Sequence, residues 1–196
     1  NSMKKTKIFL DTEFTGLHQN TSLISIGLIS ECGKTFYAEL TDYDKNQIDD
    51  WLRENVIKNL KFNDKSGMDT FWNNGNDTEL YGGKEFTRDM LSAWLSQFGE
   101  VEMWSDCLAY DWVLFNELYG HAFNIPKHVY YIPFDLCTLL KIKDIDPDIS
   151  REALACVHDM KMPNGEFPEK LEDIPKHNAL WDARIIRECY KNVINS

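Results

Sequence analysis

The spacing of hydrophobic and polar residues predicts strands at the start of the chain. Ile8, Phe9 and Leu10 form an apolar run that predicts a strand buried on both faces and ending at Asp11. The stretch "SLISIGLISECGKTFYAEL" (22–40) predicts two more strands joined by a turn at residues 31–34. The first part of the chain therefore predicts an antiparallel meander.

Helical spacing then alternates with short apolar runs. It predicts helices over residues 42–60, 85–99, 109–120, 136–143 and 178–193. The runs "VEMWSD" (101–106) and "HVYYIPFD" (128–135) predict strands, and the polar residues 61–83 predict a long surface loop that covers substrate or builds a dimer. A meander followed by alternating helices and strands predicts a mixed α/β sheet with helices on both faces.

Length and composition fit one globular domain. The chain has 196 residues and is 43% hydrophobic, with no internal repeat, so we expect a single domain over residues 4–196. We interpret Asn1 and Ser2 as additions ahead of a natural initiator, Met3. No apolar stretch is long enough for a membrane span, and no signal peptide is visible. Five cysteines without a C-x-x-C pair favour reduced, mostly buried thiols and a cytoplasmic location.

The net charge of −11 disfavours a protein that gains affinity by wrapping a phosphate backbone. It remains compatible with an enzyme that binds a few nucleotides at a strand end. There, bound divalent cations supply positive charge, and the catalytic carboxylates themselves add to the negative total.

Asp11 and Glu13 raise the question of what compensates two like charges at the end of a buried strand. A strand's period of two places them on the same side, with Thr12 on the other. Like charges repel and lose hydration on burial. Either both reach solvent, or they form a site for hard cations.

Three further polar residues stand near predicted helix starts: Asp111, Asp182 and His177. Individually, each carboxylate could interact with a helix dipole and the histidine could be a solvated or capping residue. Spacing also leaves Asp106 as an alternative to Asp111. Taken together, four carboxylates and one imidazole suit Mg²⁺ or Mn²⁺ better than structural zinc. Such clusters normally hold two cations roughly 3.5–4 Å apart.

The motifs "LDTEF", "AYDWVLF" and "HNALWD", in this order, resemble those of the DEDDh 3′–5′ exonucleases, which have a ribonuclease-H-like fold. The similarity extends from residue 7 to residue 184. Within the superfamily, the short chain and the "AYD" helix start are most similar to the small single-domain exoribonucleases of the mycobacterial type and to phage exonuclease A.

The resemblance implies a role for each of these residues. Asp11 would bridge two Mg²⁺ or Mn²⁺ ions, Glu13 and Asp182 would hold the ion that binds the attacking water, and Asp111 would support the second ion. His177 would be the general base. We expect the neighbouring carboxylates to raise its pKa, so that activity falls in mild acid.

The resemblance also implies a substrate segment and a class of substrate. Backbone amides near Phe14, Thr15 and Gly16 would contact the terminal sugar, and Leu17 would wedge against its base, although Phe14 and Leu17 could equally be core residues. The implied partner is a single-stranded 3′ end, RNA rather than DNA, with nucleoside 5′-monophosphate as product. Homodimerisation is expected by analogy alone.

Two other functions are alternatives to this one. A phosphatase of the haloacid dehalogenase type would need D-x-D-x-T where this chain has "DTEFT". A catalytically silent nucleic-acid-binding module would not need all five site residues. The release of mononucleotides distinguishes an exonuclease from both the phosphatase and the binding module. An exodeoxyribonuclease of the same fold is a variant of the exonuclease hypothesis.

Overall fold

The computed structural model describes residues 4–62 and 68–196. Asn1, Ser2 and Met3 lie outside the described residues, as do residues 63–67 of the predicted loop.

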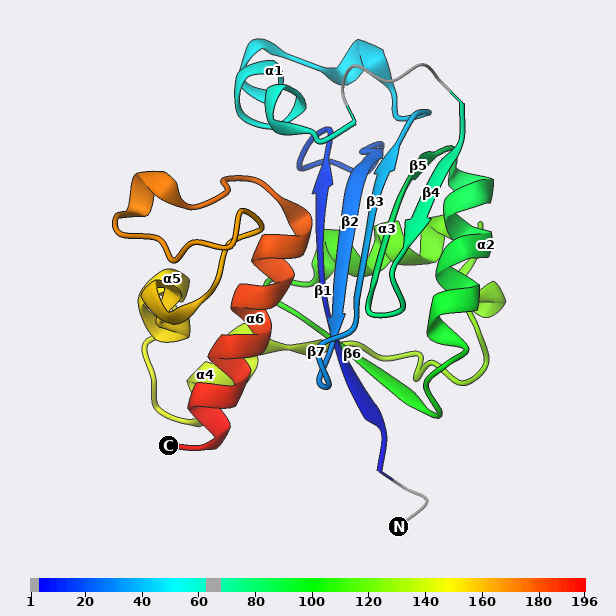
Figure 1. Ribbon diagram of the computed structural model, residues 1–196. Coiled ribbons are helices and arrows are strands. Elements are labelled where there is room, and N and C mark those ends of the chain that lie inside the picture. Colours follow the sequence, from blue (N-terminus) through cyan, green and yellow to red (C-terminus); the bar gives the residue numbers. More distant parts are fainter. Residues whose placement is uncertain (1–3, 63–67) are drawn as a thin grey trace.

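The described residues form a seven-stranded mixed sheet with the strand order β4-β5-β3-β2-β1-β6-β7 (Figure 1). The strands are β1 (Thr6–Phe14), β2 (Leu23–Ser30), β3 (Thr35–Leu40), β4 (Thr70–Asn73), β5 (Asp77–Gly82), β6 (Val101–Ser105) and β7 (Phe134–Asp135). β1–β2, β2–β3 and β4–β5 pair antiparallel, whereas β3–β5, β1–β6 and β6–β7 pair parallel. The predicted meander and mixed sheet are therefore confirmed.

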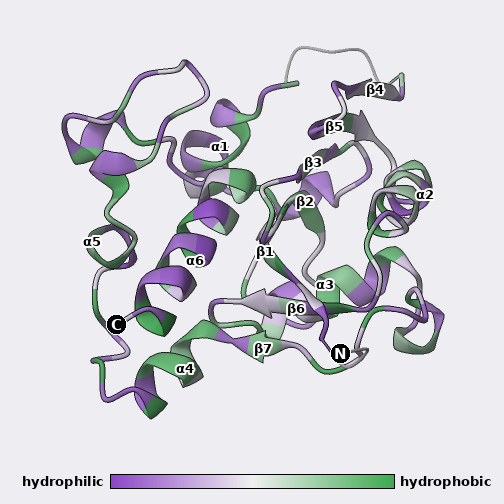
Figure 2. Ribbon diagram, turned by 60° about the horizontal axis from the view of Figure 1, so that its bottom comes forward, coloured by the Kyte–Doolittle hydropathy of each residue, from purple (hydrophilic) through white to green (hydrophobic). Residues whose placement is uncertain are grey.

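Helices cover both faces of the sheet, as predicted (Figure 1). They are α1 (Asp50–Asn55), α2 (Lys84–Leu95), α3 (Ala109–Leu118), α4 (Leu136–Ile142), α5 (Arg151–Ala155) and α6 (Ala179–Ile194). Short 3₁₀ turns lie at Lys45–Gln47, Ile57–Asn59, Ala122–Asn124, Val157–Asp159 and Leu171–Asp173. α6 packs on β1 and β2 with α4 and α5 beside it, while α2 and α3 pack on the opposite side. Both hydrophobic and hydrophilic residues occur along α2 and α6, as expected for helices with one buried face (Figure 2).

β1 is the central strand and separates two hydrophobic cores. Ile8 and Leu10 belong to the core under α2 and α3, and Phe9 belongs to the core under α6. The strand is buried on both faces, as predicted, but it continues to Phe14 instead of ending at Asp11. Asp11 and Glu13 are therefore fixed by strand pairing with β2, through Gly27 and Ser25.

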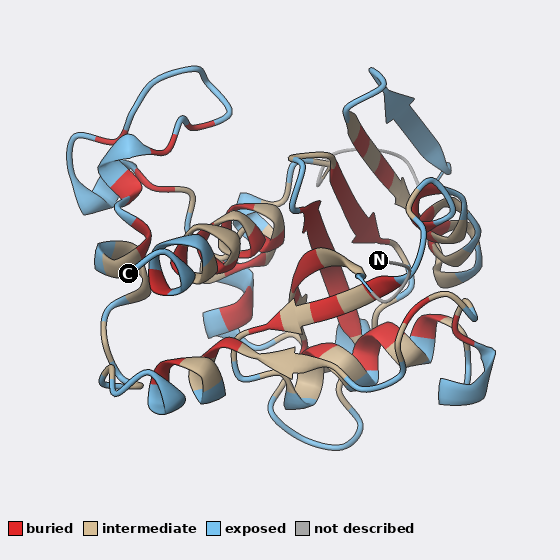
Figure 3. Ribbon diagram, turned by 90° about the horizontal axis from the view of Figure 1, so that it is seen from below, coloured by how far each residue is buried: buried red, intermediate tan, exposed pale blue. Residues whose placement is uncertain are grey.

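Three of the predicted elements differ in the structure. The helix predicted over 42–60 is broken, because Asp44 and Asp49 cap separate short segments and Ile48 between them is extended. The predicted loop 61–83 contains the β4–β5 hairpin, whose β4 edge is exposed along its length (Figure 3). The strand predicted over 128–135 is reduced to β7 and an isolated bridge between Val129 and Val101.

The cysteines also differ in part from the prediction. All five are free thiols, but only Cys189 is buried, while Cys32, Cys107 and Cys156 are exposed. Among the helices of residues 4–62 and 68–196, none has both the length and the apolar character needed to cross a lipid bilayer.

Candidate active site

Three carboxylates converge where β1 meets the first turn of α6. One oxygen each of Asp11, Glu13 and Asp182 lies within 4.8 Å of the others. Asp11 and Glu13 come from β1, and Asp182 comes from α6, whose start is capped by the Asn178 side chain accepting from the Trp181 amide at 2.8 Å. Residues 171 positions apart in the sequence thus form one acidic cluster, which we call the carboxylate cluster.

A glycine in β2 makes this approach of α6 possible. Gly27 lies opposite Asp11 in the sheet. A Cβ atom at Gly27 would stand 2.4 Å from the Leu180 backbone nitrogen and 2.5 Å from the Ala179 carbonyl carbon. Only a residue without a side chain lets the helix start this close to the strand. Gly27 was not recognised in the sequence, because one glycine in an apolar strand carries no sign of what approaches it.

Asp111 lies beside the cluster but is held differently. It is in the first turn of α3, and it is buried. The Thr12 hydroxyl donates to its Oδ1, and the Ser105 hydroxyl donates to Oδ2 at 2.5 Å. Asp106, the alternative considered from spacing, instead forms an ion pair with Arg151, with Nε to Oδ2 at 2.7 Å. The oxygens of Asp111 are not among those of the carboxylate cluster, but its charge acts on all three acids of the cluster.

Burial and mutual repulsion raise the pKa values of the acidic residues. For Asp11, burial and then Asp182, Asp111 and Glu13 raise the pKa well above its usual value. Burial, followed by Asp182 and Asp111, raises the pKa of Glu13 to about 8.

The helix-borne acids show the same direction. Burial, followed by Glu152 and Asp111, raises the pKa of Asp182 to about 7. Burial raises the pKa of Asp111 to about 6, against the lowering effect of the Ser105 and Thr12 hydrogen bonds. The sequence does not predict that Glu152 of α5 lies near Asp182, because nothing in the local sequence of α5 indicates this contact.

The cluster has the donors that a hard divalent cation requires. Asp11 Oδ2 is buried, and no group in the described residues donates a hydrogen bond to it. A buried carboxylate oxygen without a hydrogen-bond partner lowers the stability of the fold, and so does the repulsion among three acids held close together. Carboxylate oxygens are the usual ligands of Mg²⁺ and Mn²⁺, so the residues present fit such an ion.

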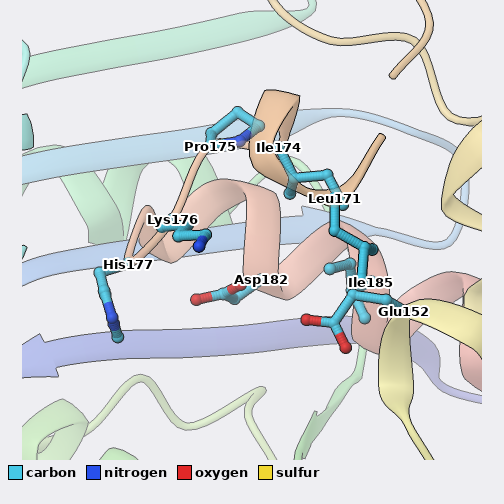
Figure 4. Close-up of a pocket in the computed structure, with 8 residues that line it drawn as sticks. All are labelled: Glu152, Leu171, Ile174, Pro175, Lys176, His177, Asp182 and Ile185. Carbon is cyan, nitrogen blue, oxygen red and sulfur yellow. The ribbon is translucent and has the colours of Figure 1, made fainter. Parts of the chain in front are cut away.

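His177 lies just before α6 and lines a cavity of about 480 Å³ together with Asp182 and Glu152 (Figure 4). Its backbone is left-handed, with a φ of 53°, and its ring makes an edge-on contact with Trp51 at 5.2 Å between centroids. Burial, followed by the charge of Lys176, lowers the pKa of His177. The predicted increase in this pKa is therefore wrong, because burial disfavours the charged ring and the positive charge of Lys176 repels it.

The segment after β1 forms part of a second cavity, of about 560 Å³, which also includes Asp11 and Asp111. Phe14 stacks on Tyr110 at 5.4 Å between centroids, and the Leu17 side chain is 77% exposed at the cavity edge. Leu17 is therefore not a core residue. The amides of Thr15 and Gly16 already donate to the Ser22 carbonyl and the Thr21 hydroxyl, each at 3.0 Å. This leaves the side chains of Phe14 and Leu17 as the groups of the segment that line the cavity.

Comparison with known proteins gives a consistent result. Residues 6–194 match the model of the Rv2179c-like family, described as a 3′–5′ exoribonuclease domain. Two proteins of Mycobacterium tuberculosis, named 3′–5′ exoribonuclease Rv2179c (strain ATCC 25618 / H37Rv) and 3′–5′ exoribonuclease MT2234.1 (strain CDC 1551 / Oshkosh), are each 27% identical to the chain over 178 residues. The alignment covers 91% of this chain and 87% of each relative.

Proposed function

Because the chain belongs to the Rv2179c-like 3′–5′ exoribonuclease family, we propose that it removes nucleoside 5′-monophosphates from single-stranded RNA 3′ ends with the help of Mg²⁺ or Mn²⁺. The observation that carries this proposal is the convergence of Asp11, Glu13 and Asp182, together with a buried Asp11 oxygen to which none of the described residues donates a hydrogen bond. The resemblance to DEDDh exonucleases implies two ions per site.

Asp11, Glu13 and Asp182 would hold the cations, and Asp111 would contribute from the α3 side. When bound, the cations supply positive charge that activates water and stabilises the leaving oxygen of a phosphodiester. Thr12 and Ser105 fix the orientation of Asp111, because each donates a hydroxyl to a different carboxylate oxygen. The pairing of β1 with β2 fixes the backbone positions of Asp11 and Glu13.

His177 would accept the proton of the attacking water on an imidazole nitrogen. Its lowered pKa keeps the ring neutral at physiological pH, which is the form that can accept a proton. Trp51 packs against the ring and limits its orientations. The base of the terminal nucleotide would contact Leu17 and the stacked pair Phe14 and Tyr110, because bases pack well on apolar and aromatic side chains.

The test uses RNA and DNA oligomers of one sequence, each labelled at the 5′ end, with Mn²⁺, Mg²⁺ or EDTA. We expect a ladder that shortens from the 3′ end, faster on RNA, and absent with EDTA or in Asp182→Asn. Asp89→Asn, a change of the same chemistry on the exposed surface of α2, should retain activity. RNA that is bound but never shortened with either metal would contradict the proposal and favour a binding module instead.

A further inference from the structure

Two cysteines lie together beside the carboxylate cluster but outside it. Cys107 follows β6, and Cys137 is in the first turn of α4. Their sulfur atoms and one carboxylate oxygen of Asp106 all lie within 4.8 Å of one another. Cys107 is exposed and Cys137 is half-buried, so a small ion can reach both sulfur atoms from solvent.

Asp135 builds this pair by binding both backbones. Its Oδ1 accepts from the Cys107 amide at 3.1 Å and from the Cys137 amide at 3.1 Å. Asp135 is itself fixed by its pairing with Ser105 in the sheet. Cys107 adopts a left-handed backbone with a φ of 54°, which is uncommon for a residue with a side chain. The hydrogen bonds of one Asp135 oxygen to both backbone amides, together with the left-handed backbone of Cys107, therefore place the two thiols close together.

Burial and the surrounding acidic side chains keep the Cys107 thiol protonated when no ion is bound. Burial, followed by Asp106, Cys137 and Asp135, raises the pKa of the Cys107 thiol to about 11, while Arg151 acts in the opposite direction. Arg151 binds both oxygens of Asp106, at 2.7 Å and 3.2 Å, and so compensates that carboxylate. Asp135 is the other carboxylate beside the two sulfur atoms, and within the described residues its Oδ1 accepts only from the two cysteine amides.

We propose that Cys107, Cys137 and Asp106 form a binding site for a thiophilic divalent cation of the Zn²⁺ class. Zinc binds thiolate sulfur at about 2.3 Å, which in a tetrahedral site places two sulfur atoms roughly 3.8 Å apart. The two sulfur atoms already lie within 4.8 Å of each other without an ion. The fourth position would be taken by water, as in other zinc sites with three protein ligands.

This site differs in chemistry from the carboxylate cluster. Thiolate ligands select zinc and similar soft ions, whereas an all-carboxylate site selects Mg²⁺ or Mn²⁺. Binding would release the protons of both thiols to solvent, since the thiolate is the ligand form. Asp106 and Cys107 line the same cavity as Asp11 and Asp111, so the ion would form part of the wall of that cavity.

The test uses Co²⁺ as a spectroscopic substitute for Zn²⁺, in the presence of a phosphine reductant that keeps the thiols reduced. Cobalt bound to thiolate has a charge-transfer band in the near ultraviolet, and cobalt bound only to carboxylates does not, so the readout is independent of nuclease activity. We expect one equivalent of Co²⁺ to produce the band and Zn²⁺ to remove it.

Single substitutions locate the site. Cys107→Ser and Cys137→Ser should each weaken or abolish the band, while Cys32→Ser, a change at another exposed cysteine, should leave it intact. Circular dichroism checks that each variant is folded. If Cys137→Ser does not fold, the result for Cys107→Ser decides the test, because Cys107 is exposed and its substitution should not affect folding. No band in the wild type, or a band unchanged by Cys107→Ser, would overturn the proposal.

Discussion

Asp11 and Asp111 are acids beside the same cavity, yet the fold treats them in opposite ways. Both oxygens of Asp111 accept a hydroxyl hydrogen bond, from Thr12 and from Ser105, and its pKa rises to about 6. Asp11 has a buried oxygen without a partner in the described residues, and burial followed by three neighbouring acids raises its pKa. Asp111 is thus positioned by the protein alone, whereas Asp11 belongs to a group that needs a positive partner.

The hydrogen bonds to Asp111 therefore stabilise the fold, whereas the repulsion among the acids of the carboxylate cluster destabilises it. Removing a donor to Asp111 should weaken both fold and activity, because a buried carboxylate loses a hydrogen bond. Neutralising a member of the carboxylate cluster should weaken activity but strengthen the metal-free fold at a pH where that member is ionised, because it removes repulsion. Opposite signs of the stability change are therefore expected from residues that lie close together.

The largest effect is expected for Glu13→Gln, which keeps the shape of the side chain and removes its charge. Activity should fall about 10³-fold, as when a single electrostatic contact to a transition state is lost. At a pH above about 8, where metal-free Glu13 is ionised, the melting temperature in EDTA should rise by about 2–4 °C for each kcal/mol of repulsion removed. Initial rates and thermal melts measure both, with Glu117→Gln on the exposed side of α3 as the control. A lower melting temperature would show that Glu13 is a structural residue.

Gly27→Ala tests whether the approach of α6 to β2 positions Asp182. The new methyl group would meet backbone atoms of Leu180 and Ala179, which cannot move aside without shifting the helix. We expect a free energy of unfolding lower by about 1–3 kcal/mol and activity lower on the order of 10²-fold. Chemical denaturation and rate measurements check this. Gly99→Ala is the matched control, because the described residues leave space around Gly99; equal effects in both variants would refute the account.

Thr12→Val removes one donor to Asp111 without changing the size of the side chain greatly. Activity should fall about 10–100-fold, the usual effect of losing a residue that orients a ligand. The free energy of unfolding should fall by about 1–3 kcal/mol. Urea denaturation in EDTA gives the sign of the stability change. An increase would mean that Asp111 is repelled like Asp11 and that the contrast between them does not hold.

The pH dependence of stability tests the same repulsion without any substitution. Without metal, Asp111, Asp182 and Glu13 have pKa values of about 6, 7 and 8. In the unfolded chain these values are near 4, about 3.9 for Asp and 4.3 for Glu. Between these limits the folded state binds more protons, so stability should fall as the pH rises from about 4 to about 8 and level off above. Melting curves in EDTA across this range should show a smaller slope for Glu13→Gln than for the wild type.

The central strands could be predicted from the sequence, but the edges of the fold could not. Apolar runs such as Ile8 to Leu10 favour a buried strand, because they are short and contain β-branched and aromatic residues. The β4–β5 hairpin was missed because β4 is exposed and β5 buries only alternate residues such as Thr78 and Leu80. Asp49, which begins α1, has the same polar character as the surrounding residues, so its cap was not recognised.

The candidate site shows the same division between local and distant information. The two carboxylates of β1 were predicted to share a side from the strand period, and both belong to the carboxylate cluster. The hydroxyl donors to Asp111, the space at Gly27 and the effect of Lys176 on His177 depend on contacts made only in three dimensions. The catalytic roles of the five predicted site residues, the binding of cations and the formation of a homodimer remain predictions.

The most direct test of the account is the number of protons released when Mn²⁺ binds at pH 7, measured by titration calorimetry in buffers of different ionisation enthalpy. If Asp11, Glu13 and Asp182 hold protons that a cation displaces, as their raised pKa values imply, binding should release protons. The release should diminish in Glu13→Gln and at a pH above 9. Binding of Mn²⁺ without proton release, or with equal release in Glu13→Gln, would contradict the claim that these acids are held together for a cation.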